Sequence, residues 1–195
     1  MAEQTDVTNR GGGIVVALPV ALPPLVLALV GTTHPMVLDT TTAHHWWTMH
    51  VWLLPVFPLL AVGLLVMLRG EREPLAWAAR VAAFLYAVYY TGLDTLSGIA
   101  AGIAFDAAGS RDATVDRLFA IGNNLGGIGR WTWVAAVVLT FAVLVRRHGL
   151  RMLAGAVVTV VGALAFAFDH IYWPWGVAGV ALTAVGFAAT ELARR

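Results

Sequence analysis

The sequence predicts an all-α fold: a polytopic bundle of six transmembrane helices with both termini in the cytoplasm. Three observations predict it. Of the 195 residues, 59% are hydrophobic and only 12% are charged, and the mean hydropathy is +0.79. A soluble domain carries about 25% charged residues, so lipid must cover much of this surface. The apolar residues also form six long stretches, and the arginines gather in alternate connections between them.

The chain begins with a polar, glycine-rich segment, residues 1–13, which we expect to be a disordered cytoplasmic tail. Residues 14–195 then form a single six-helix domain. The first apolar stretch, residues 14–30, contains three prolines, which bend helices. It has the length of a signal-peptide core, but the tail before it is not clearly basic and no A-x-A-like cleavage motif follows. We therefore expect a kinked first membrane helix that is retained.

Five further helices are expected at 46–69, 75–104, 117–145, 151–168 and 176–189. The helix at 46–69 contains Pro55 and Pro58, which indicate a bend. The helix at 75–104 is long for a span of about 20 residues, so it is tilted or leaves the bilayer. A charged turn, a polar loop at residues 105–116 and two short connections separate these helices. The first three helices do not repeat the pattern of the last three.

The arginines predict the orientation, because positive residues in short loops stay in the cytoplasm. The nine on one side of the predicted bundle are Arg10, Arg69, Arg72, Arg80, Arg146, Arg147, Arg151, Arg194 and Arg195. Only Arg111 and Arg117 fall on the other side, and Arg130 lies within a span. We therefore expect a multi-pass protein of the cytoplasmic membrane whose histidine-rich loop faces outward. A composition rich in Ala, Val, Gly and Arg is typical of bacterial proteins from GC-rich genomes.

Absent residue types exclude several classes of chemistry. The chain has no lysine, which excludes Schiff-base catalysis and a covalently bound retinal. It has no cysteine, which excludes disulfides, thiol relays, cysteine-ligated clusters and thioether-linked haem. It also lacks a basic patch with interleaved aromatic residues, so no nucleic-acid partner is expected.

Polar residues within the expected spans are the main candidates for a site, since they are costly in hydrocarbon. Asp94 lies 16 residues before the hairpin centre near Ser110 and Arg130 lies 20 after it, so their depths differ by only ~6 Å. We assign both as candidate catalytic residues that line an outward-open cavity; alternatively, an Asp94–Arg130 ion pair locks two helices. Asn123 and Asn124 are candidate ligand-binding residues or interhelical hydrogen-bonding residues.

Glycines favour a close approach of the same two helices. Gly98 and Gly102 on one helix, and Gly122 and Gly126 on the next, form small-xxx-small pairs that let helix backbones approach. The run around residues 122–129 matches no nucleotide-binding fingerprint, because it lies within an apolar span and no strand precedes it.

Four of the six histidines, at positions 34, 44, 45 and 50, lie in the outward loop and the helix that follows it. His50 is within a span, where an ionisable residue is by default a functional candidate, and we assign it a catalytic or metal-binding role. His170 lies at comparable depth and is a candidate metal or ligand-binding residue. Asp169 beside it is a further candidate ligand-binding residue, placed to fix the His170 tautomer. His45 is the third candidate metal ligand.

Spacing alone does not place these histidines together. His45 and His50 are five residues apart and do not share a helix face, so a metal site needs a loop residue (His34, Asp39, His44 or His45) to fold back towards His50. A solvated role is the simpler reading of the loop histidines.

These observations predict an integral membrane protein with an outward-facing polar pocket that binds a small ligand or a metal. The candidate cofactors are haem b or a divalent metal ion, and the candidate partners are the lipid bilayer and a small polar or lipid-derived ligand. A membrane-embedded enzyme or redox protein, an accessory subunit and a small transporter all fit the same residues. The sequence leaves the catalysed reaction and the oligomeric state open.

Overall fold

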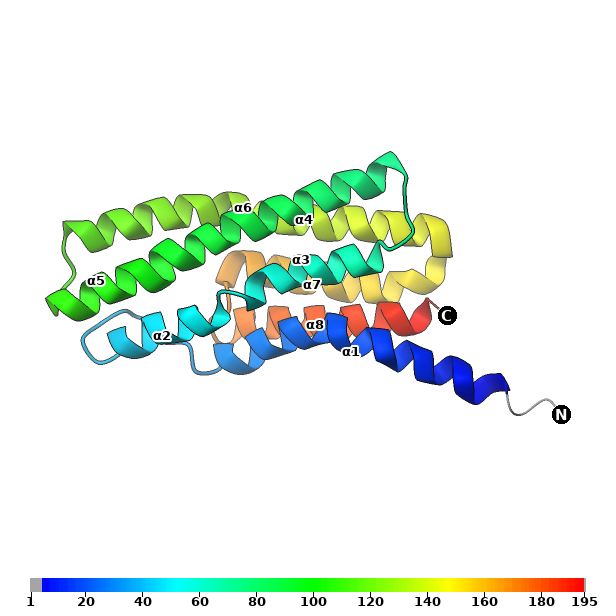
Figure 1. Ribbon diagram of the computed structural model, residues 1–195, viewed down its shortest axis with the longest axis horizontal. Coiled ribbons are helices and arrows are strands. Elements are labelled where there is room, and N and C mark those ends of the chain that lie inside the picture. Colours follow the sequence, from blue (N-terminus) through cyan, green and yellow to red (C-terminus); the bar gives the residue numbers. More distant parts are fainter. Residues whose placement is uncertain (1–4, 195) are drawn as a thin grey trace.

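The computed structural model describes residues 5–194, and their side chains from Ala17 onward. The described residues form helices and no strand, so the predicted all-α class is confirmed (Figure 1). In chain order the helices are α1 (Thr5–Gly31), α2 (Ala43–Leu53), α3 (Val56–Met67), α4 (Pro74–Leu93), the π-helix η1 (Asp94–Ala100), α5 (Ala101–Ala108), α6 (Ala113–His148), the 3-10 helix η2 (Leu150–Met152), α7 (Leu153–Asp169) and α8 (Trp175–Ala193).

The helices form six rods. Helix α3 continues α2, the segments α4, η1 and α5 run on without a break, and α1, α6, α7 and α8 each form one rod (Figure 1). Four stretches of the described chain are long and apolar enough to cross a membrane: Ala43–Met67, Ala113–His148, Leu150–Asp169 and Trp175–Ala193. Helix α1 adds a shorter apolar segment, Ala17–Gly31.

Several helix boundaries differ from those expected. Helix α1 begins at Thr5 rather than at residue 14, because extending an existing helix gains one hydrogen bond per residue. The segment expected to be a disordered tail, residues 1–13, is therefore helical from Thr5 onward. Residues 1–4 lie outside the described residues. The helix expected at 46–69 starts at Ala43 and is interrupted after Leu53. Pro58 explains the interruption, since its ring clashes with the carbonyl four residues earlier.

Helix α6 begins earlier than expected because Asp112 caps it. The Asp112 carboxylate accepts hydrogen bonds from the backbone amides of Thr114 and Val115, each at 2.9 Å. Such a cap satisfies amides that have no partner within the helix. The helix ends at Gly149, whose positive φ of 78° suits a glycine after a helix.

The glycines confirm only half of the predicted helix pairing. Helix α6 lies along α4, and a Cβ atom at Gly126 would lie 2.7 Å from Leu93, so the small residues of α6 do allow this approach. Gly98 and Gly102, however, face α2 instead of α6. A Cβ at Gly98 would overlap the His50 ring, and one at Gly102 would lie 2.8 Å from Trp47.

One end of the bundle carries a network of ion pairs. The start of α1, the end of α8, the α3–α4 connection and the α6–α7 connection all lie there (Figure 1). Arg69 binds both carboxylate oxygens of Glu191, at 2.7 and 3.0 Å, and the Glu191 side chain is fully buried. Arg147 binds Glu71 at 3.0 Å. The arginines at this end therefore join neighbouring helices through ion pairs, in addition to giving this end its positive charge.

Candidate metal centre

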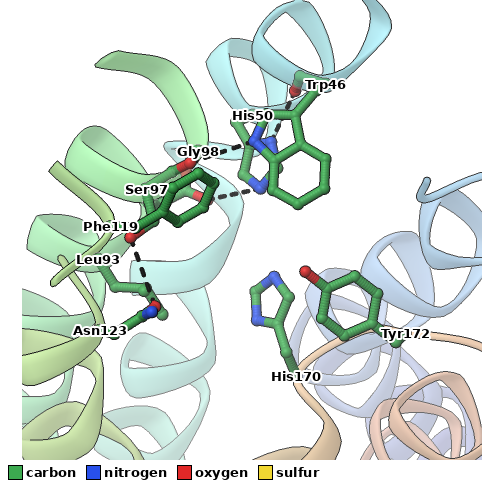
Figure 2. Close-up of a pocket in the computed structure, with 10 residues that line it drawn as sticks. Trp46, His50, Leu93, Ser97, Gly98, Phe119, Asn123, His170 and Tyr172 are labelled. Atoms are coloured by element: carbon green, nitrogen blue, oxygen red, sulfur yellow. Dashed lines mark hydrogen bonds and ion pairs between the residues drawn. The ribbon is translucent and has the colours of Figure 1, made fainter. Parts of the chain in front are cut away.

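Three histidines from distant parts of the chain converge away from the ion-pair end. His34 lies in the loop after α1, His50 lies on α2, and His170 follows α7. One ring nitrogen of each lies within 4.8 Å of the others. The His34 ring centroid is 5.1 Å from that of His50 and 5.6 Å from that of His170. Figure 2 shows His50 and His170 extending from opposite sides into the same space.

Hydrogen bonds orient two of these rings and define their tautomers. Nδ1–H of His34 donates to the Pro35 carbonyl at 2.7 Å, and Nδ1–H of His50 donates to the Trp46 carbonyl at 2.6 Å. A carbonyl oxygen only accepts, so each Nδ1 carries the proton and each Nε2 is bare in the neutral ring. This is how protein groups orient histidines that bind metal through the other nitrogen.

His170 follows the same pattern with a different partner. Its Nδ1 lies 2.5 Å from the hydroxyl oxygen of Tyr90, which can accept the Nδ1 proton and leave Nε2 for an ion. The backbone of His170 has a φ of 53°, in the left-handed region that non-glycine residues rarely adopt. Such backbone strain clusters at functional sites.

Asp94 completes the cluster with a carboxylate. Its Oδ1 lies 3.8 Å from Nε2 of His50, and only 2% of the residue is exposed. Neither Asp94 oxygen accepts a hydrogen bond from the described part of the chain, and Nε2 of the buried His34 is also without one. Buried polar atoms are normally hydrogen-bonded, because leaving them without a partner is costly. The Asp94 oxygens and Nε2 of neutral His34 are acceptors, so a cation bound by the histidines would supply a partner to His34 and a positive charge beside Asp94.

A π-helix and a glycine make room for this arrangement. Asp94 is the first residue of η1, and π-helical turns inside α-helices occur frequently at functional sites. Gly98, one π-turn later, lets the His50 ring lie against the η1 backbone. Nε1–H of Trp46 donates to the Ser97 carbonyl at 3.1 Å and ties α2 to η1.

The two groups of the site that lie in loops, His34 and Tyr172, are electrically neutral at pH 7. Burial, with a smaller contribution from His50, lowers the pKa of His34 to about 3, so its ring is the neutral imidazole that metal ions bind. Burial raises the pKa of Tyr172 to about 12, so its hydroxyl keeps its proton. The Tyr172 and His34 rings pack edge to face, 4.5 Å apart.

A cavity of about 130 Å³ adjoins the histidines. His50, His170, Asn123 and Tyr172 line it (Figure 2). Asp94 lines it as well. If the histidines bind an ion, this cavity has space for a further ligand of that ion.

Other expected residues lie outside the cluster. Arg130 forms no ion pair with Asp94 among the described side chains; it is exposed and lines a second cavity. Asn124 is exposed on α6. His45 is also exposed, and its Nε2 bonds the Thr33 carbonyl at 3.2 Å. Asp169 was expected to orient His170, but the hydroxyl of Tyr90 contacts that Nδ1 instead.

Two participants were not assigned from the sequence. From the sequence, His34 is only one of several loop residues that would have to fold back towards His50. A loop has no regular spacing from which its contacts could be predicted. Tyr90 did leave a signal, since it precedes Asp94 by four residues and so shares a helix face with it.

Comparison with known proteins adds no template for this site. No protein-family model, curated protein or solved structure matches the chain. Its function is therefore inferred from the geometry of the histidine cluster.

Proposed function

We propose that this protein is an integral protein of the cytoplasmic membrane that binds one divalent transition-metal ion through His34, His50 and His170. Asp94 lies beside the ion, and the adjoining cavity opens towards the outside of the cell. The observation that carries the proposal is the convergence of three imidazoles whose Nδ1 atoms are all hydrogen-bonded, which leaves their Nε2 atoms for an ion. The unpartnered Asp94 carboxylate lies 3.8 Å from Nε2 of His50.

The membrane setting is supported by composition and by charge placement. Four described stretches have the length and hydropathy of membrane spans, and six rods agree with six crossings, N-in and C-in. The start of α1 and the end of α8 lie at the same end of the bundle, which is the end where arginines gather (Figure 1). By the positive-inside rule that end is cytoplasmic, and the histidine cluster then faces outward.

The ligand set favours a zinc-like ion. Imidazole nitrogens suit zinc, copper, iron and nickel, whereas magnesium and calcium prefer oxygen ligands. Catalytic zinc sites keep three protein ligands and leave one position to water. Nitrogens around a tetrahedral zinc lie about 3.3 Å apart, given Zn–N bonds of ~2.0–2.1 Å, so binding would draw the three rings inward.

The arrangement is suited to activating water. An ion held by the three histidines would acidify a water ligand, and the Asp94 carboxylate, whose Oδ1 lies 3.8 Å from Nε2 of His50, would be the nearby base for its proton. We therefore propose metal-assisted hydrolysis as the reaction class. Haem is less well supported, because the His34 ring packs against both His50 and His170 and the cavity beside them measures only about 130 Å³.

Metal analysis of the purified protein tests this proposal. We expect about one zinc or cobalt ion per chain after loading and desalting in a mild detergent. His34→Ala, His50→Ala and His170→Ala should each lower the retained metal at least tenfold, since a three-ligand site loses a third of its donors. His44→Ala and His45→Ala, which remove exposed histidines nearby, should retain it.

Circular dichroism and gel filtration of each variant show whether it is folded. Equal metal retention by folded wild-type and His34→Ala protein would contradict the proposed site. His34 is the most informative position to change. It lies in a loop, so it can contact His50 and His170 only if the loop folds as the structure shows.

A further inference from the structure

A second cavity of about 250 Å³ lies next to His170, and residues of α4, α6 and α7 line it. Leu93, Asn123 and His170 line both this cavity and the smaller one beside the cluster. The two cavities are therefore neighbours that share these side chains. A molecule in the second cavity would lie next to His170, one of the proposed metal ligands.

Arg130 gives the second cavity a positive charge. It is exposed near the middle of α6, within a stretch apolar enough to span a membrane. Among residues 17–194, no carboxylate forms an ion pair with it; its guanidinium lies 5.9 Å from the ring centroid of Trp131. Charged residues inside spans are costly and mark substrate or ion pathways. A guanidinium in this position is suited to a planar or tetrahedral anion, which it can bind with two donors.

Exposed aromatic side chains lie at this cavity. Phe168 of α7 lines it and is 69% exposed, and its ring centroid lies 5.8 Å from that of Trp131 on α6, which is 49% exposed. Gly127 lines the cavity, and a Cβ added there would meet no described atom within 4 Å. The cavity therefore combines one cation with aromatic edges and open space on the side that faces lipid in the proposed membrane setting.

We propose that this cavity binds an amphiphile whose anionic group is the phosphate of a long-chain alkyl phosphate monoester. Arg130 holds the phosphate, the chain leaves between α6 and α7 past Trp131 and Phe168, and the ester P–O bond lies beside His170. Hydrolysis there would break this P–O bond, add the oxygen of water to phosphorus and release the long-chain alcohol. This inference rests on the proposed function for its membrane setting, and it names the substrate class of the metal centre. It does not depend on the identity of the metal.

Native mass spectrometry of the full-length protein, released from dodecyl maltoside, tests the proposal with dodecyl phosphate as the probe. We expect saturable binding of one molecule, weakened about tenfold or more by Arg130→Gln, because hydrogen bonds between charged groups are the strong ones. Arg117→Gln is the matched control, since Arg117 is exposed on the same helix and does not line the cavity. It should bind as the wild type does.

A second pair of variants tests the location without changing charge. Gly127→Leu should fill the cavity and abolish binding while the protein stays folded, because its Cβ has open space. Ala120→Leu makes a comparable change at an exposed position of α6 outside the cavity and should have no effect.

The remaining probes separate the sources of the anion. Inorganic phosphate and dodecanol should each bind at least tenfold more weakly than dodecyl phosphate. Inorganic phosphate binding as tightly would overturn the amphiphile assignment, and equal dodecyl phosphate binding by wild type and Arg130→Gln would overturn the role of Arg130. Metal content measured on the same samples distinguishes the two proposals: a metal-free protein with Arg130-dependent binding refutes only the metal centre.

Discussion

Gly98 decides where the His50 imidazole lies. A Cβ at this position would overlap the ring carbons of His50, so an alanine must push the ring or α2 away from η1. We predict that Gly98→Ala lowers the zinc or cobalt affinity at least tenfold, because metal ligands displaced by even 1 Å no longer meet at one point. Metal titration of the purified protein measures this effect.

The control for this substitution is Gly127→Ala, at a helical glycine whose added Cβ meets nothing described within 4 Å. It should leave the metal affinity unchanged. If Gly98→Ala folds and binds metal as tightly as the wild type, the His50 ring is not held where the structure places it.

For single residues, the sequence predicted which side chains belong to the site better than it predicted which side chains contact one another. His50, Asp94 and His170 were recognised because each is polar at a similar depth of an apolar bundle, and the structure brings all three together. The pairing of Asp94 with Arg130 failed, because depth along a helix says nothing about which face a residue occupies. His34 was not assigned, because loop conformation follows from tertiary contacts that no local pattern records.

The π-helix is the element that brings Asp94 and Gly98 to α2. Its seven residues, Asp94–Ala100, continue α4 into α5 with a wider turn than an α-helix. That change in twist alters which residues face α2, and it explains why Gly98 and Gly102 meet α2 although simple helical spacing assigned them to α6. The sequence predicted one long helix here and carries no signal for the π-turn.

A glycine seam joins α7 to α8. Gly155 and Gly162 on α7 face Gly179 and Gly186 on α8, and a Cβ at Gly162 would lie 2.5 Å from the Gly179 carbonyl oxygen. Both pairs are seven residues apart, which keeps them on one face of each helix. Thr183 on the same seam satisfies its hydroxyl by donating to the Gly179 carbonyl, so the helices pack closely without polar strain.

We predict that Gly162→Val destabilises the protein by about 1–3 kcal/mol, the usual cost of inserting atoms into a packed interface. Thermal unfolding in detergent, followed by circular dichroism, measures the change in midpoint. Gly127→Val, at a helical glycine with open space, should leave the midpoint within the error of the wild type. Equal midpoints for all three proteins would show that α7 and α8 do not pack through this seam.

The whole molecule separates its two kinds of polar residue. Arg69, Arg147, Glu71 and Glu191 form ion pairs at the end where α8 finishes, whereas the histidine cluster lies away from that end. The six rods and their order followed from apolar stretches and polar connections, which are properties of the sequence itself. Their lateral arrangement did not, because it depends on glycine contacts between helices distant in the chain.

The central claim is that one ion bridges histidines from three separate segments of the intact protein. X-ray absorption spectroscopy of the zinc-loaded protein in lipid nanodiscs tests it most directly. The account predicts three imidazole nitrogens at ~2.0–2.1 Å from zinc in the wild type and two in any residual metal-bound His34→Ala protein. A coordination shell made of oxygen alone, or an identical spectrum for the wild type and the His34→Ala variant, would contradict it.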